Sequence, residues 1–157
     1  HGADAILYWG SSFLKSEACR ASIYALTKEL AALQPFLTAP NVPGVRLSVI
    51  EDKNPDMTPR VAGLARCAGD DWLVVLVNED DVPHTAVIVE GLEALNGRTL
   101  CQLYTEDAAV VARGELIARL QPKAVQVYVT SRDYEACCGD ARAFGRSAEG
   151  AQSGEAG

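Results

Sequence analysis

The densest group of side chains that could do acid–base or metal chemistry is the acidic run Glu79-Asp80-Asp81, with His84 close behind it. Paired carboxylates cleave glycosides only when they face each other across the sugar, about 5–5.5 Å or 6.5–9.5 Å apart. Three consecutive loop residues do not supply that geometry, and calcium needs more oxygen ligands at a defined spacing. The pattern therefore predicts a solvated turn at 79–81 and an exposed or edge position for His84.

Cysteine is the next reactive residue type, and its spacing argues against a metal centre. The five cysteines are Cys19, Cys67, Cys101, Cys137 and Cys138. No CxxC pair occurs among them, and the only histidines are His1 and His84. We therefore expect reduced thiols, no zinc site and no disulfide framework, a usage that favours a cytoplasmic location.

Two further groups of side chains suggest chemistry or binding. Ser11 and Ser12 lack the GxSxG spacing of a nucleophile elbow, so a serine hydrolase is not expected. Trp72, Tyr104 and Tyr128 could form a carbohydrate-binding platform on a sheet. Aromatic residues at strand positions more often pack in a core or at its rim, and that packing role is the one we expect here.

The first forty residues have the pattern of one strand followed by one helix. The apolar run 4–9 ends at Gly10-Ser11-Ser12, which is typical of a buried strand entering a loop. Apolar side chains then recur at steps of 4, 3, 4, 3 and 4: Cys19, Ile23, Leu26, Leu30, Leu33 and Leu37. This spacing predicts one long helix over 16–37, with Ser16 as its N-cap and Pro35 distorting its last turn.

The remainder of the chain has the pattern of an all-β domain. Pro40 and Pro43-Gly44 interrupt the helical pattern. Seven strands are then predicted, at 45–49, 61–66, 72–78, 84–90, 99–104, 115–120 and 124–130. Turn residues between them, with no helical pattern, predict an antiparallel sandwich. After Tyr134 the sequence is rich in Gly, Ala, Ser and charge, which predicts a disordered tail.

The expected fold class is therefore mixed: one strand and a long helix, followed by an antiparallel β-sandwich. The predicted parts are a strand and helix at 1–38, a linker at 39–44, the sandwich at 45–132 and the tail at 133–157. One strand and one helix cannot close a core by themselves. We therefore expect their packing partners to lie upstream of residue 1.

Length and charge narrow the possible functions. The chain has 157 residues, too few for a complete α/β barrel of about 250. Its formal charge of −7 disfavours nucleic acid and anionic membrane surfaces as partners. No apolar run approaches the about 20 residues of a membrane span, and no signal peptide is recognised at the start.

Four segments, in this order, resemble the C-terminal end of clan-A type glycoside hydrolases of the multidomain β-galactosidase and cellulase kind. Residues 2–10 look like the eighth strand of their (β/α)8 barrel, and 16–37 like the eighth helix. Residues 72–78 look like a sandwich strand ending in Asn, and 120–128 like the closing sandwich strand. The resemblance covers residues 2–131 and implies a barrel remnant followed by a β-sandwich.

The resemblance also implies a function and one binding residue. Trp9, at the end of the barrel strand, would stack a sugar next to the cleaved bond. The family's catalytic carboxylates lie on the fourth and seventh barrel strands, which this chain lacks, so no catalytic residue and no cofactor are assigned. The expected function is a C-terminal part of a glycosidase with a structural sandwich, whose partners are the upstream barrel and a carbohydrate substrate. The alternative is a stand-alone carbohydrate-binding or protein-interaction module.

Overall fold

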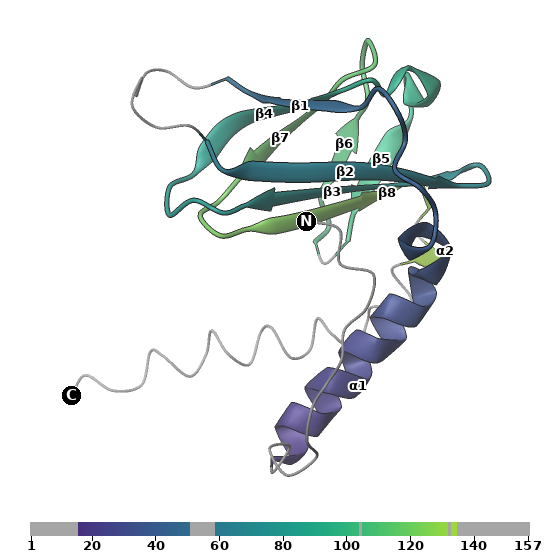
Figure 1. Ribbon diagram of the computed structural model, residues 1–157, viewed down its shortest axis with the longest axis vertical. Coiled ribbons are helices and arrows are strands. Elements are labelled where there is room, and N and C mark those ends of the chain that lie inside the picture. The colour runs from purple at the N-terminus through teal and green to yellow at the C-terminus, as the bar shows by residue number, and fades with distance from the viewer. Residues whose placement is uncertain (1–15, 51–58, 104, 132, 135–157) are drawn as a thin grey trace. The chain divides into compact units, whose positions relative to one another are not determined.

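A computed structural model of the protein describes residues 16–50, 59–103, 105–131 and 133–134 (Figure 1). These residues form two compact units: a helical unit with residues 16–38 and 133–134, and a β unit between Ala39 and Arg132. The predicted strand at 4–9 and nearly all of the predicted tail lie outside the described residues.

The helical unit contains α1 (Glu17–Ala32) and α2 (Gln34–Leu37). Ser16 is the N-cap of α1, as predicted, because its hydroxyl accepts a hydrogen bond from Cys19 N at 3.1 Å. The prediction of one unbroken helix over 16–37 is wrong, because the helix stops at Leu33 and restarts around Pro35. Proline has no N–H for the helical ladder, and its ring clashes with the preceding turn.

Burial is uneven along the helical unit. None of the side chains of α1 is buried, although its apolar stripe has helical spacing. Phe36 in α2 is fully buried, and its ring contacts Tyr134 with 5.0 Å between ring centroids. On the apolar stripe of α1, Cys19 is exposed, whereas Ile23, Leu26 and Leu30 are half-buried. Burial is thus complete only at Leu33 and Phe36, beyond the end of α1.

The β unit consists of two antiparallel sheets. Its elements are β1 (Arg46–Val49), β2 (Val61–Ala68), β3 (Asp71–Asn78), β4 (His84–Glu90), the 3₁₀ helix η2 (Glu93–Leu95), β5 (Thr99–Gln102), β6 (Ala108–Val110), β7 (Leu116–Leu120) and β8 (Val125–Val129). One sheet has the order β1-β4-β7 and the other β2-β3-β8-β5-β6. The predicted antiparallel strands are all present, whereas β6 was not predicted because three residues are too few to show an alternation.

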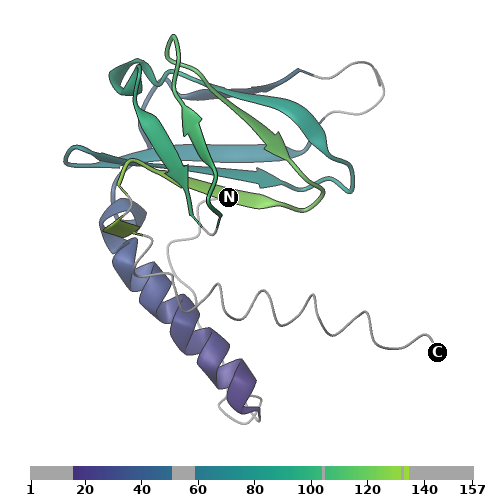
Figure 2. The ribbon, with the colours of Figure 1, turned by 180° about the vertical axis from the view of Figure 1, so that it is seen from behind.

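The main core lies between these two sheets, whose separate layers are visible in Figures 1 and 2. Alternate residues of each strand point inward, as the pleat requires. From the five-stranded sheet they include Val74, Leu76 and Tyr128, and from the three-stranded sheet Val87 and Leu116. Each of these side chains is almost inaccessible to solvent.

The chain joins the sandwich before β1. Asn41 forms an isolated bridge with Arg66, and the Val42 N–H donates to the Ala65 carbonyl at 2.8 Å. The Arg66 guanidinium also donates from Nε to Asn41 Oδ1 at 3.0 Å. Residues 41 and 42 are therefore held along the edge of β2.

Candidate functional site

The acidic run singled out in the sequence forms the connection from β3 to β4, where the chain crosses from one sheet to the other. The prediction of a solvated turn is wrong for Asp80, which is only 4% exposed. It holds for Asp81, whose side chain is 84% exposed. The prediction for His84 is also wrong, because His84 is 2% exposed and begins the central strand of the three-stranded sheet.

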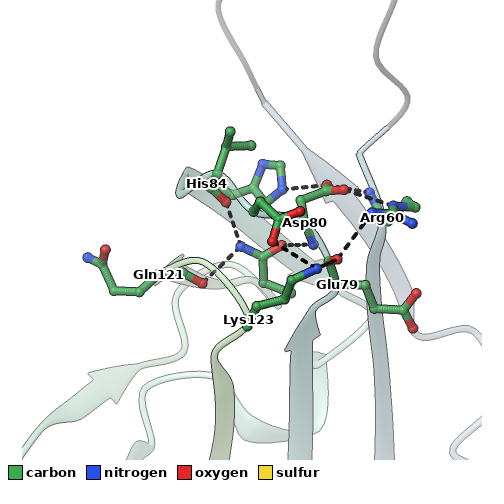
Figure 3. A network of polar contacts seen from close by, with 9 residues as sticks. Arg60, Glu79, Asp80, His84, Gln121 and Lys123 are labelled. Carbon is green, nitrogen blue, oxygen red and sulfur yellow. Dashed lines mark hydrogen bonds and ion pairs between the residues drawn. The ribbon is translucent and has the colours of Figure 1, made fainter.

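Asp80 is the centre of a buried polar network (Figure 3). One carboxylate oxygen, Oδ2, accepts from the backbone N–H of Arg60 at 2.7 Å and lies 2.9 Å from His84 Nε2. The other, Oδ1, accepts from Arg60 Nε at 3.0 Å. Both oxygens of the carboxylate are therefore occupied by partners from outside the turn, which is how a protein offsets the cost of burying a charge.

Asn78 and Lys123 connect this network to the β7–β8 turn. The Asn78 amide donates to the Val82 carbonyl at 2.8 Å and to the Gln121 carbonyl at 2.9 Å, while its oxygen accepts from Asp80 N. Lys123 N donates to the Asp80 carbonyl at 3.1 Å. Since β7–β8 is another crossing between the sheets, the network ties two crossings together.

Hydrogen bonding sets the charge of Asp80. The backbone N–H of Arg60 and then its guanidinium hold the pKa of the Asp80 carboxyl below its ordinary value, although burial acts in the opposite direction. A buried Asp–His pair can orient a histidine for general-base catalysis. Here both carboxylate oxygens already have partners, and the described buried polar side-chain atoms are all satisfied. The arrangement is that of a structural clamp.

A second feature is an apolar surface on the outside of the five-stranded sheet. Paired residues share a face, and the register of β2, β3 and β8 forms the rows Ala62–Val77–Val125, Leu64–Val75–Val127 and Arg66–Leu73–Val129. We call the eight apolar members of these rows the outer apolar face. Leu73, Val127 and Val129 are buried, whereas Val75 and Val77 are half-buried and Val125 is 55% exposed.

The aromatic platform considered from the sequence is not formed. Tyr128 belongs to the core between the sheets, where burial raises the pKa of its hydroxyl and Gln126 Oε1 accepts its hydrogen bond at 3.0 Å. Trp72 packs against the same core. The packing role is therefore confirmed for these two residues, while Tyr104 and Trp9 lie outside the described residues.

Three of the five cysteines lie among the described residues. Cys19, Cys67 and Cys101 are free thiols, of which Cys101 is buried, and Cys137 and Cys138 lie outside the described residues. Among the residues that the structure describes, no group of three or more His, Cys, Asp or Glu side chains is placed to hold a metal ion. The described helices include none that is long and apolar enough to cross a membrane.

Comparisons with known proteins find similarity among solved structures. No family model matches the sequence, and a search among curated proteins finds no match. Nineteen chains of solved structures match, among them an α-amylase from Anoxybacillus whose crystal structure gives insights into a new glycosyl hydrolase subclass. That match has 22% identity and a TM-score of 0.45, and it covers 69% of this chain but 22% of the amylase. The chain thus spans about a fifth of that enzyme's length.

Proposed function

We propose that this chain is the C-terminal part of a glycoside hydrolase, in which residues 39–132 form a non-catalytic sandwich. The sandwich would pack against the catalytic domain that precedes it, a (β/α)8 barrel of the same polypeptide. The observation that carries the proposal is the outer apolar face of the five-stranded sheet. The resemblance of the four sequence segments supplies the identity of the expected partner.

An antiparallel sheet that has one face in a core and one in water normally alternates apolar and polar residues. Strand β3 instead has apolar side chains on both faces from Trp72 to Val77, and β8 has Val125, Val127 and Val129 on its outer side. The accessible members of this face, Ala62, Leu64, Val75, Val77 and Val125, form paired neighbours on three strands. Such a contiguous apolar surface favours burial against another domain.

The described carboxylates support a non-catalytic role. A glycosidase acid is usually kept protonated by an apolar, buried environment. Asp80 is the buried carboxylate of the described residues, and its oxygens are held by Arg60 and His84 as an ionised group. The proposed sandwich therefore contributes stability and domain placement, while the reaction belongs to the preceding domain.

The test compares two exposed apolar residues on opposite outer faces. Val125 is 55% exposed on the five-stranded sheet, and Ile117 is 59% exposed on the three-stranded sheet. In the 157-residue chain, Val125→Glu and Ile117→Glu should each change the free energy of unfolding by no more than about 0.5 kcal/mol. In the complete polypeptide, which includes residues encoded before His1, only Val125→Glu should destabilise, by about 2–4 kcal/mol, because it buries an unpaired charge.

The measurements are thermal unfolding and hydrolysis of aryl glycosides. We expect turnover by the complete polypeptide and none by the 157-residue chain. Equal effects of the two Glu substitutions in the complete polypeptide would contradict docking through the outer apolar face. Turnover by the purified chain, abolished by a single carboxylate substitution within it, would overturn the proposal as a whole.

Trp9 provides a separate test of the barrel assignment. If Trp9 stacks the sugar next to the cleaved bond, Trp9→Ala should lower kcat/KM of the complete polypeptide by about 10–100-fold, or roughly 1.4–2.8 kcal/mol of transition-state stabilisation. Trp72→Phe, in a residue that packs against the sandwich core, is the matched aromatic control and should leave kcat/KM unchanged. A Trp9→Ala enzyme with unchanged kcat/KM would remove Trp9 from the substrate site.

A further inference from the structure

A polar pocket lies at the end of the sandwich where β4 stops. Its volume is about 310 Å³, and it is lined by three glycines and five charged residues. Arg46 and Glu90 come from paired positions on β1 and β4. Glu93 comes from η2, and Arg113 and Glu115 come from the β6–β7 turn. All of these residues belong to the β unit, so the pocket is complete within it.

The charged groups of the pocket are not used for internal pairing. Within the described part of the chain, the side chains of Arg46, Glu90, Glu93, Arg113 and Glu115 make no hydrogen bond or ion pair. Arg46 and Glu90 are cross-strand neighbours, a position in which opposite charges commonly attract each other, but no ion pair joins their side chains. Guanidinium and carboxylate groups thus remain available around one concave surface.

The backbone that shapes the pocket is held in place. Gly91 has φ +87°, and a Cβ on it would lie 2.6 Å from the Gly44 carbonyl oxygen, so the two segments can approach only without a side chain there. Gly114 N donates to Asn96 Oδ1 at 3.0 Å, and the Gly114 carbonyl accepts from Leu92 N at 2.9 Å. The turn that carries Arg113 is therefore fixed against η2.

The lining chemistry restricts the class of ligand. With three carboxylates and two guanidinium groups in the lining, a simple anion or a simple cation meets groups of its own sign as well as of the opposite sign. None of the eight lining residues is aromatic or aliphatic, which disfavours an apolar ligand. A neutral molecule with many hydroxyl groups can donate to the carboxylates and accept from the guanidinium groups at the same time. The volume equals that of about ten water molecules, enough for a small ligand of this kind.

We infer that this pocket binds a neutral saccharide through hydrogen bonds from Arg46 and Arg113 and to Glu90, Glu93 and Glu115. The inference does not depend on the proposed function, because the site lies wholly on the sandwich and requires no preceding domain. Without an aromatic stacking surface the affinity is modest, with a dissociation constant of about 1–10 mM.

The test is a titration of the ¹⁵N-labelled 157-residue chain, followed by NMR. The probes are maltotriose, cellotriose, xylotriose and mannotriose, with inorganic phosphate and glycylglycine as charged comparisons. At least one trisaccharide should produce saturable shifts of the amide signals of Gly91, Glu93 and Gly114. Arg113→Asn, which keeps a residue type that tolerates a positive φ, should weaken that binding by about 10-fold.

Two further variants keep the outcome clear. Arg46→Gln should weaken binding of the same trisaccharide without altering the β6–β7 turn. Arg119→Gln, at an exposed position of β7 away from the pocket, should leave this binding unchanged. Absence of saturable shifts at these amides with every trisaccharide at about 50 mM would overturn the inference. Binding of phosphate or glycylglycine without any trisaccharide would also overturn it, because the site would then select charge.

Discussion

The two ends of the sandwich use similar charged residues in opposite ways. Strand β4 begins at His84 in the buried network and ends at Glu90 beside the polar pocket, and β7 runs back from the pocket to the network. At the network end, Asp80 is buried and engages Arg60 and His84. At the pocket end, two arginines and three glutamates line an open concavity without pairing among the described residues.

This difference follows from the cost of removing a charge from water. A buried carboxylate without partners would cost several kcal/mol, so Asp80 is compatible with the fold only together with the donors that surround it. The pocket side chains keep access to solvent and need no internal partner. The network therefore holds two crossings between the sheets together, whereas the pocket leaves its charged groups available to a ligand.

The largest expected effect is the loss of stability when an asparagine is replaced, which should differ between the two ends of the sandwich. Asn78→Ala removes three hydrogen bonds in the buried network and leaves the Val82 and Gln121 carbonyls without that donor. It should lower the free energy of unfolding by about 3–5 kcal/mol. Asn96→Ala, which removes one bond to Gly114 N at the exposed end, should cost about 0.5–1.5 kcal/mol. Urea denaturation measures both, and equal losses would contradict the assigned difference between the ends.

A pair of glycines tests how tightly the pocket end is built. Gly91 and Gly97 both have positive φ, but an added Cβ meets the Gly44 backbone only at Gly91 and nothing within 4 Å at Gly97. Gly97→Ala should therefore cost only the about 1–2 kcal/mol of a left-handed conformation. Gly91→Ala should cost more in urea denaturation and should shift the NMR signals of the pocket residues. A smaller loss for Gly91→Ala than for Gly97→Ala would show that the two segments separate freely.

The smallest expected effect is a dependence of stability on pH. Because the pKa of the Asp80 carboxyl is lowered from 3.8 by folding, its contribution is present above that value and is lost as the pH falls through the folded pKa. Unfolding midpoints measured from pH 5 to pH 2 (about one point every half unit) should fall less steeply for Asp80→Asn than for the parent chain. Asn96→Ala, which removes no ionisable group, is the control and should keep the parent slope. Parallel curves of unfolding midpoint against pH for all three proteins would show that Asp80 does not contribute to the loss of stability in acid.

Much of the β unit could be predicted from local patterns. Alternating or continuous apolar runs located β1 to β5, β7 and β8, because the side-chain period of two reflects which face is buried. The three-residue strand β6 was missed because it is too short to show a period. The long-helix prediction failed at Leu33, because a stripe of apolar residues continues through Pro35 while the helical hydrogen bonds do not.

The sequence by itself determined seven of the eight strands and the residue at which the first helix begins. Tertiary structure decided the environment of the charged residues. Asp80 can be buried because Arg60, 20 positions earlier in the chain, donates a hydrogen bond to its carboxylate. The Gln121 carbonyl, which accepts a hydrogen bond from the Asn78 amide, lies 43 positions after Asn78. Local sequence patterns predict secondary structure through the spacing of apolar residues and through helix caps, which involve residues close together in the chain. Pairing of charges depends on chain segments that only folding brings together.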